Sequence, residues 1–353
     1  MISIALVGCG RIAQRHSELL GSGLVGGARL AAVCDRRIEK AKEIAVRHKV
    51  PAFGDMDEMM QNCRPIDVVS ILTPSGLHAE HAMRLAKYGC HLIVEKPMAL
   101  TLEDADAMIK ECTERGIRMF VVKQNRFNVP VLKLREAIEE GRFGKLVLGT
   151  VRVRWCRTQE YYDAAEWRGT WALDGGVLTN QASHHIDLLE WLLGDVESVF
   201  AKSVTALVDI EAEDTGVAIL KFKNGALGVI EATTATRPKD LEGSISILGE
   251  KGSVVVGGFA VNEMEVWQFT EPQIGDAEIL KKFSTNPPDV YGFGHKAYYE
   301  HVVDCIQKNR KALVDGLEGR KSLELITAMY ESIETGKEVR MRFAPRLCRL
   351  GQK

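Results

Sequence analysis

The segment HLIVEKPMAL, residues 91–100, carries a lysine out of an apolar run and follows it at once with proline. A lysine at the carboxyl end of a strand can hydrogen-bond a substrate oxygen, and burial would ease the loss of its proton. Lys96 is therefore a candidate acid or base for a reaction at a hydroxyl or carbonyl carbon. Pro97 fixes the backbone beyond it, and the bond between the two is a candidate for the cis form. A structural salt bridge with Glu95 is the alternative reading of this lysine.

A second constellation lies in the middle of the chain, where the Gly175-Gly176 pair leads into the letters SHHID. His184 and Asp187 are three residues apart, so they share one face of a helix. A histidine at a helix start can exchange protons near neutral pH. The adjacent His185 must then point away from that face. His184 is the second candidate for acid–base chemistry.

The N-terminal segment contains the pattern G-x-G-x-x-A, which begins at Gly8 and includes Gly10, Arg11 and Ile12. It follows an apolar run and opens a helix-like segment. Glycines there allow the backbone to approach a pyrophosphate, and the helix N-terminus offers free N–H groups. Asp35 follows about 20 residues later, where a carboxylate can meet the adenosine ribose. The pattern predicts a dinucleotide site, and a glycine turn without a ligand is its alternative.

The choice between the two nicotinamide cofactors depends on three neighbouring residues. Asp35 favours NAD because a carboxylate repels a 2′-phosphate. Arg36 and Arg37 favour NADP because guanidinium groups can accept that phosphate. We give the carboxylate more weight and expect NAD.

Residues 1–122 alternate between strand-like and helix-like segments, which predicts a Rossmann domain with a doubly wound parallel sheet. The expected strands are residues 2–7, 29–34, 67–72, 91–94 and 117–122, and the expected helices are residues 12–20, 38–48, 77–88 and 102–115. Ligands of such sheets bind beyond the carboxyl ends of the strands. We therefore expect Thr73, Pro74 and His78, which follow the third strand, to contact the cofactor.

Residues 123–353 show a different pattern and predict a second, α+β domain with a large, mostly antiparallel open sheet. The expected strands are residues 146–155, 199–206, 216–222, 226–234, 244–248, 253–256 and 263–269, and the expected helices are residues 129–140, 181–193, 294–307 and 319–335. Asn224-Gly225 predicts a tight hairpin. An open sheet needs a cover, so we expect a homo-oligomer, a dimer or tetramer, built through this sheet.

The composition argues against several other classes of protein. The chain has 353 residues, is 46% hydrophobic and 27% charged, and has a formal net charge of -2. It offers no bulk charge for nucleic acid or an anionic membrane and no apolar run near the ~20 residues of a membrane span. We expect a cytoplasmic protein. Its eight cysteines form no C-x-x-C pair, and His78 and His81 lack a third ligand, so we expect no metal.

The glycine pattern, the Glu95-Lys96-Pro97 motif and the G-G-x(7)-H-x-x-D spacing from Gly175 to Asp187 together resemble the Gfo/Idh/MocA oxidoreductases over essentially the whole chain. The resemblance implies hydride transfer between NAD(P) and a sugar or polyol. It also implies that Lys96 and His184 form the catalytic pair. The alternative outside the enzymes is a catalytically silent NAD-binding regulator, and the presence of both residues argues against it.

Other site residues follow from the same resemblance. Glu95, Lys96 and Gln124 are expected to contact the cofactor. Asn180 stands where many members of the family carry an aspartate. Its amide can position a hydroxyl but cannot take the proton, so the acid–base work would fall on Lys96 or His184.

A narrower resemblance is to the bacterial UDP-N-acetyl-2-amino-2-deoxyglucuronate dehydrogenases. It rests on residues 122–128, 159–163, 167–170, 180–184, 210–215 and 241–244. It implies oxidation of a UDP-linked N-acetylated amino-sugar uronate at C3 to the 3-keto sugar, in making surface polysaccharide such as O-antigen. Some members of that group keep NADH bound and recycle it with 2-oxoglutarate. A dehydrogenase of a free sugar or inositol is the alternative on the same fold.

Such a substrate carries a diphosphate and a carboxylate, and these segments supply arginines and aromatic residues. Arginine forks suit both anions, and aromatic rings can stack on a sugar or uracil. The expected substrate contacts are Lys96, Arg126, Arg157, Tyr161, Tyr162, Trp167, Arg168, Asn180, Ser183 and His184. The alternative is that these are surface charges and core aromatics.

Overall fold

The computed structural model describes residues 1–284, 293–341 and 348–352. The chain divides into two compact units. The first unit comprises residues 1–122 and 295–320, and the second comprises residues 123–294 and 321–353.

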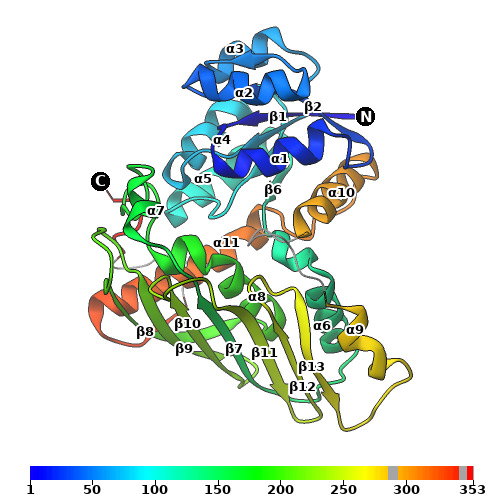
Figure 1. Ribbon diagram of the computed structural model, residues 1–353, viewed down its shortest axis with the longest axis vertical. Helices are drawn as coiled ribbons and strands as arrows, with labels where there is room; N and C mark the ends of the chain where they lie inside the picture. The colour runs from blue at the N-terminus through cyan, green and yellow to red at the C-terminus, as the bar shows by residue number, and fades with distance from the viewer. Residues whose placement is uncertain (285–292, 342–347, 353) are drawn as a thin grey trace. The chain divides into compact units, whose positions relative to one another are not determined.

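A six-stranded parallel sheet forms the core of the first unit, in the order β3-β2-β1-β4-β5-β6 (Figure 1). Its strands are β1 (Ile2–Val7), β2 (Ala28–Cys34), β3 (Ala52–Phe53), β4 (Val68–Ile71), β5 (His91–Val94) and β6 (Met119–Val121). Every described pairing in it is parallel. The order reverses between β1 and β4, which is where such sheets bind ligands. The predicted Rossmann sheet is confirmed, and β3 is an additional strand.

The helices of this sheet domain begin where the sequence supplies an N-cap or a turn. They are α1 (Arg11–Gly21), α2 (Ile38–His48), α3 (Met56–Asn62), α4 (His78–Ala86) and α5 (Leu102–Glu114). The Asp55 carboxylate accepts the N–H groups of Asp57 and Glu58 at the start of α3, and the Thr101 hydroxyl accepts that of Asp104 in α5. These side-chain caps mark where α3 and α5 begin.

Residues 295–320 belong to the first unit, although the sequence pattern places them in the second domain. They contain most of α10 (Gly294–Gln307) and the start of α11 (Gly316–Thr335). The Val121 N–H donates to the Val314 carbonyl oxygen at 3.2 Å, and Gly316 and Gly319 pack directly on Met119 and Val121 of β6. The chain thus comes back to the first unit through contacts between residues about 200 positions apart. A local sequence pattern cannot show such contacts.

An eight-stranded sheet forms the second unit, in the order β13-β12-β11-β7-β10-β9-β8-β14 (Figure 1). Its strands are β7 (Leu146–Arg154), β8 (Val196–Val204), β9 (Thr215–Phe222), β10 (Leu227–Thr233), β11 (Glu242–Gly249), β12 (Gly252–Gly257), β13 (Glu263–Phe269) and β14 (Val339–Arg340). All pairings are antiparallel except that of β7 with β10. The predicted mostly antiparallel sheet is confirmed, as is the hairpin at Gly225, where φ is +90°.

Within the described part of the second unit, helices cover one face of this sheet and leave the other face exposed. Gly149 and Gly228 lie on the covered face and leave room for Leu189 of α8 (Ser183–Leu193). The remaining helices of the unit are α6 (Val129–Glu139), α7 (Gln159–Asp163) and α9 (Ile279–Lys282). On the open face, β9 exposes Val217 and Ile219. The same face carries Phe200 of β8 and Val229 of β10, so apolar side chains of three adjacent strands lie together.

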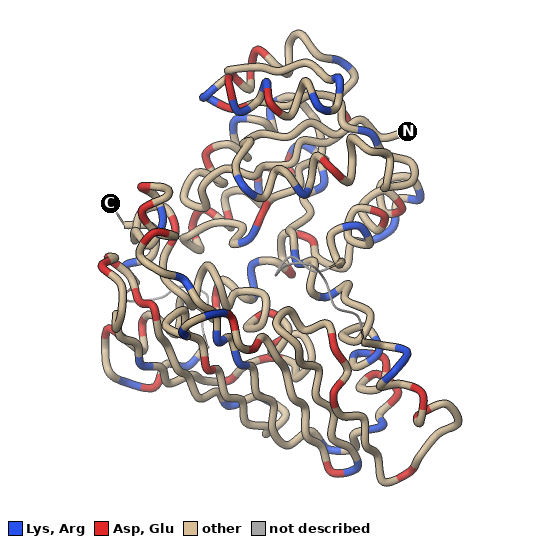
Figure 2. The backbone as a smooth tube through the Cα atoms, viewed as in Figure 1, with Lys and Arg blue, Asp and Glu red and all other residues tan. Residues whose placement is uncertain are grey.

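Along the backbone of both units, positions of Lys and Arg are interspersed with positions of Asp and Glu, as Figure 2 shows. Among the helices that the structure describes, none combines the length and the apolar character needed to cross a bilayer.

Candidate functional site

The glycine loop of the first unit has the geometry that its pattern predicts. Gly8 has a φ of +96°, and a side chain there would meet the Leu72 carbonyl group at 2.8 Å, so only glycine fits. Gly10 precedes α1 in an extended conformation, without a side-chain cap, and the space beside it is open. Arg11 is exposed and Ile12 is half-buried at the start of α1. The N–H groups at the start of this helix are therefore accessible to an anion.

Asp35 lies at the end of β2 and is half-buried. One of its carboxylate oxygens accepts the Cys9 N–H at 2.8 Å and the other accepts the Arg37 N–H at 2.8 Å. The carboxylate thus ties β2 to the glycine loop and keeps acceptor capacity for a ribose hydroxyl. Arg36 and Arg37 are exposed.

His78 connects two loops of the first unit. Its ring is buried, with Nδ1 at 2.8 Å from the Pro97 carbonyl oxygen and Nε2 at 2.9 Å from the Thr73 carbonyl oxygen. Burial lowers the pKa of His78, against the opposing effect of these carbonyl groups. The predicted contact of His78 with a cofactor would therefore be indirect, through the loops that carry Thr73, Pro74 and Lys96.

Lys96 follows β5 at the carboxyl edge of the parallel sheet and is half-buried. The Lys96–Pro97 peptide bond is cis, as the sequence suggests. The Lys96 N–H donates to Oε2 of Glu95 at 3.0 Å, and Oε1 of Glu95 lies 3.1 Å from Nε2 of His16. Burial acts to raise the Glu95 pKa, but the hydrogen bond and charge of His16 outweigh it and lower the pKa to about 2. Glu95 is thus a buried carboxylate behind the lysine.

His184 begins α8 in the second unit and is buried. Its Nε2 lies 3.0 Å from the amide nitrogen of Gln124, so the glutamine fixes the ring from within the same unit. His185 points the other way, packs edge-on against Trp155, and has a pKa lowered to about 4 by burial. It is neutral near pH 7 and faces the core, as the spacing predicts.

Asp187 holds α8 in a buried ion cluster. Arg126 donates to its two carboxylate oxygens at 2.7 and 2.9 Å, and the ammonium of Lys123 lies 3.6 Å away. The guanidinium also stacks on Trp191. Each of the three charged side chains is 2% exposed. Arg126 therefore positions Asp187 and α8, and its contact with a substrate stays a prediction.

Asn180 lies on a π-helical turn, Val177–Gln181, that leads into α8. Its amide nitrogen hydrogen-bonds Asp174, and its side-chain oxygen Oδ1 accepts from the Gln181 amide at 3.1 Å. The Ser183 hydroxyl donates to the Asn180 carbonyl oxygen at 3.3 Å. Asn180 and Ser183 thus lie on the turn that leads to His184, and their contact with a substrate stays a prediction.

Glu213 holds the π-helical turn Val177–Gln181 through hydrogen bonds, a role that no sequence pattern indicates. One of its oxygens accepts the Leu178 N–H and the Tyr330 hydroxyl, both at 3.0 Å. Tyr330 in turn lies 2.7 Å from the Thr179 hydroxyl. Burial raises the Glu213 pKa to about 7.

An arginine–aromatic cluster follows β7 in the second unit. The Arg168 guanidinium lies 4.0 Å from the Tyr161 ring centroid and 5.5 Å from that of Trp167. Two of its nitrogens, Nε and Nη1, are buried and have no hydrogen-bond partner among the residues that the structure describes. Arg157 lies over Tyr161 but is paired with Asp240 at 2.9 Å. Arg168 is therefore the arginine of this cluster best prepared to receive an anion.

Tyr162 does not share that environment. It is buried, and its hydroxyl lies 3.1 Å from that of Thr234. Its ring packs edge-on against Tyr161. Tyr162 therefore supports Tyr161 from the core, and its own contact with a substrate stays a prediction.

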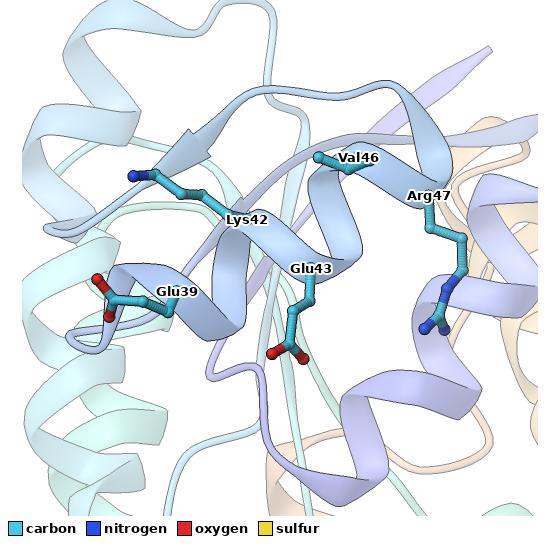
Figure 3. A pocket seen from close by; sticks show the side chains of 5 residues that line it. All are labelled: Glu39, Lys42, Glu43, Val46 and Arg47. Carbon is cyan, nitrogen blue, oxygen red and sulfur yellow. The ribbon is translucent and has the colours of Figure 1, made fainter.

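A surface hollow along α2 is unrelated to these residues. Figure 3 shows its five side chains, Glu39, Lys42, Glu43, Val46 and Arg47, fanning out from one helix face. Arg47 already hydrogen-bonds Gln14 at 2.7 Å. Mixed charges that do not converge give no binding site.

Comparison with known families matches both units. The description "Oxidoreductase family, NAD-binding Rossmann fold" covers residues 2–123, and "Oxidoreductase family, C-terminal alpha/beta domain" covers residues 135–341, both from the Gfo/Idh/MocA group. Two solved structures are similar throughout. The WlbA dehydrogenase from Bordetella pertussis, in complex with NADH and UDP-GlcNAcA, is 45% identical with a TM-score of 0.92, covering 97% of this chain and 98% of that one.

The second structure is the WlbA dehydrogenase from Chromobacterium violaceum, also with NADH and UDP-GlcNAcA. It is 45% identical with a TM-score of 0.90, covering 97% of this chain and 96% of that one. Among curated proteins, the myo-inositol 2-dehydrogenase of Thermotoga maritima is 29% identical over 96% of this chain and 98% of its own length.

Replacing Glu213 with glutamine should reduce the pH dependence of stability. The folded protein binds the Glu213 proton more tightly than the unfolded chain, whose glutamate pKa is about 4.3. Its stabilising contribution is complete below that value and is lost as the pH rises through the folded pKa of about 7. In urea unfolding between pH 4.5 and 8, we expect the wild type to lose up to roughly 3 kcal/mol more than Glu213→Gln.

Glu211→Gln is the matched control, because this glutamate is exposed and two residues away. It should retain the wild-type pH dependence. Parallel pH profiles for the wild type and Glu213→Gln would contradict the assignment.

Proposed function

Because the chain belongs to the Gfo/Idh/MocA oxidoreductase family, we propose that it oxidises the C3 hydroxyl of UDP-GlcNAcA, a UDP-linked N-acetylated amino-sugar uronate. The family confirms the coarser predictions: the chain is an NAD-dependent sugar dehydrogenase, and its first unit is an NAD-binding Rossmann domain. The substrate is supported by one observation above all. Identity is 45% to two dehydrogenases solved with UDP-GlcNAcA but 29% to the myo-inositol enzyme.

The arginine–aromatic cluster supports the same substrate on chemical grounds. UDP-GlcNAcA carries a carboxylate and a diphosphate, whereas inositol and free sugars carry no charge. A guanidinium with buried, unsatisfied nitrogens is costly unless an anion binds it. We therefore assign Arg168 to an anionic group of the substrate, with Tyr161 and Trp167 beside it and Arg157 in a supporting position.

We assign the catalytic roles to Lys96 and His184. In the proposed reaction the C3 hydrogen leaves as hydride to the nicotinamide, which accepts two electrons, and the hydroxyl proton passes to a side chain. Lys96 and His184 would hold the hydroxyl oxygen and receive that proton, while Asn180 positions a hydroxyl through its amide. The carboxylate of Asp35 and the loop at Gly8 and Gly10 would hold the dinucleotide.

The biological setting is part of the same proposal. We place the reaction in the cytoplasm, in the synthesis of surface polysaccharide such as O-antigen, with 2-oxoglutarate as the acceptor that recycles NADH. This rests on the narrow resemblance described above. Oxidation of a free sugar or inositol is the second candidate, and it is supported by the curated dehydrogenases of myo-inositol and scyllo-inositol at 29% and 23% identity.

The substrate is tested by nicotinamide absorbance of the purified protein. With NAD present, we expect UDP-GlcNAcA to produce NADH, and 2-oxoglutarate to remove it again. Lys96→Ala should lower the rate by at least about 100-fold, the usual contribution of a positioned acid or base. Reduction with myo-inositol or glucose and none with UDP-GlcNAcA would reject the nucleotide-sugar substrate in favour of a free polyol.

Arg168→Ala should weaken binding of the nucleotide sugar. We expect the KM for UDP-GlcNAcA to rise at least about tenfold, because a charge-assisted hydrogen bond to an anion is lost, with kcat changed much less. The matched control is Arg152→Ala, a half-exposed arginine of β7 whose carboxylate partners lie 3.6 and 3.9 Å away. Equal KM values for wild type and Arg168→Ala would remove Arg168 from the substrate site.

We further propose that a second copy of the chain covers the open face of the second unit's sheet. Ile219 pairs across the sheet with Phe200 on one side and Val229 on the other, and all three are exposed. A contiguous apolar row on three adjacent strands is typical of an interface. Association about a two-fold axis would place this row against the same row of the partner.

Ile219→Asp should convert the oligomer to monomers, because it places a charge in the middle of the apolar row. Light scattering coupled to gel filtration measures the mass directly. Val46→Asp is the control, since Val46 is even more exposed but lies on α2 (Figure 3). A wild type that elutes as a monomer of 39.1 kDa would contradict the proposal.

A further inference from the structure

A buried chain of hydrogen bonds in the first unit ends at the peptide of Lys96. The Tyr299 hydroxyl lies 2.6 Å from Nδ1 of His16, and Nε2 of His16 lies 3.1 Å from Oε1 of Glu95. The other Glu95 oxygen accepts the Lys96 N–H at 3.0 Å. The chain thus joins α10, α1 and the end of β5, which are far apart in the sequence.

Packing fixes the geometry of this chain. His16 and Tyr299 are completely buried, and Glu95 is 6% exposed. The His16 ring is held edge-on by Tyr299, with centroids 5.5 Å apart, and by His295, with centroids 5.3 Å apart. The Tyr299 hydroxyl also donates to Ser70 of β4 at 3.4 Å. A side chain held on several sides can position its neighbour within a fraction of an ångström.

The hydrogen-bond chain keeps the Glu95 carboxylate negatively charged beside Lys96. Burial alone would raise the Glu95 pKa, yet His16 and the charges of His295 and Lys96 lower it to about 2, so the group is a carboxylate at neutral pH. The titratable groups that face Glu95 are His16 from α1, His78 from α4, His295, Tyr298 and Tyr299 from α10, and the adjacent Lys96.

The turn is also held on its far side. His78 lies 2.8 Å from the Pro97 carbonyl oxygen, so the residues on both sides of Lys96 have a buried partner. Lys96 itself is half-buried at the edge of the sheet. The backbone on both sides of Lys96 is therefore held by His16 and His78, two histidines from other helices of the same unit.

We propose that His16 is a positioning residue for Lys96: it keeps Glu95 charged, and Glu95 fixes the Lys96 backbone and favours the ammonium form of its side chain. The inference rests on the proposed catalytic role of Lys96. It adds a function for His16 and Tyr299 that neither the glycine pattern nor the Glu95-Lys96-Pro97 motif contains.

A metal ion is the competing interpretation of the same residues. The ligand atoms of His16, Glu95 and His295 all lie within 4.8 Å of one another. The hydrogen-bond chain already gives both His16 nitrogens a partner, so a cation is not needed to satisfy them. Elemental analysis of the purified protein separates the two interpretations, and a stoichiometric divalent metal would overturn ours.

The decisive test measures the protonation of Lys96 without any sugar. In the NAD-bound protein, the rate at which a small amine-acylating reagent modifies Lys96 is followed against pH by peptide mass spectrometry. In His16→Leu, Glu95 loses the contact with His16 and can take up a proton more easily, so the Lys96 midpoint should move about one pH unit lower. His16→Gln keeps a donor for Glu95 and should shift the midpoint less.

The controls separate positioning from general damage. His48→Leu makes the same change at the C-terminal end of α2 and should leave the midpoint unchanged. Tyr299→Phe removes one hydroxyl and serves where His16→Leu does not fold, with a smaller shift in the same direction. An unchanged midpoint in the His16 and Tyr299 variants would overturn the proposal.

Steady-state kinetics adds a second readout. We expect His16→Leu to lower kcat at least about tenfold with the sugar KM within about threefold, and His16→Gln to recover most of the loss. The acylation result does not depend on which sugar is oxidised. A wrong substrate would leave the midpoint shift intact, whereas an unchanged midpoint with active wild-type enzyme would reject the role of His16 alone.

Discussion

A buried carboxylate destabilises a fold by several kcal/mol unless cations and hydrogen-bond donors surround it. Each unit of this protein keeps one beside a candidate catalytic residue. In the first unit, Glu95 is held by His16 and accepts the N–H of Lys96. In the second unit, Asp187 is held by Arg126 and lies three residues after His184 on α8. In both units the partners that stabilise the buried carboxylate also hold its position. The backbone that carries the neighbouring candidate catalytic side chain is thereby held in place.

The parallel sheet was predictable because its signals are local. Strands buried on both faces read as apolar runs, and a helix separates each consecutive pair of strands. The prediction missed β3, which has two residues and no apolar run. It also assigned residues 295–320 to the second domain, because the pairing of Val121 with Val314 joins segments that no local window contains. The open antiparallel sheet was predictable from alternation and from the Asn224-Gly225 turn.

The site residues divide in the same way. The glycine loop, Asp35 and the turn before α8 depend on backbone conformations that residue type and spacing reveal. The burial of Arg126 and Tyr162 was not predictable, because residue type does not say which face of an element is buried. The supporting residues His16, Tyr299 and Glu213 carry no local signal. Each acts on a segment at least 30 positions away, so only the folded chain shows their roles.

The relatives share one scaffold but differ in the charge of what they bind, and charge is what the arginines of this chain can discriminate. Arg126 is neutralised by Asp187 and Arg157 by Asp240, so neither carries information about a ligand. Arg168 differs, because two of its nitrogens are removed from water with no hydrogen-bond partner in the described part of the chain. An unsatisfied buried donor costs about 1–3 kcal/mol, and more when it is charged. A neutral polyol offers no anion to offset this free-energy cost. A nucleotide-linked uronate carries anionic groups that can hydrogen-bond the guanidinium and offset the cost on binding.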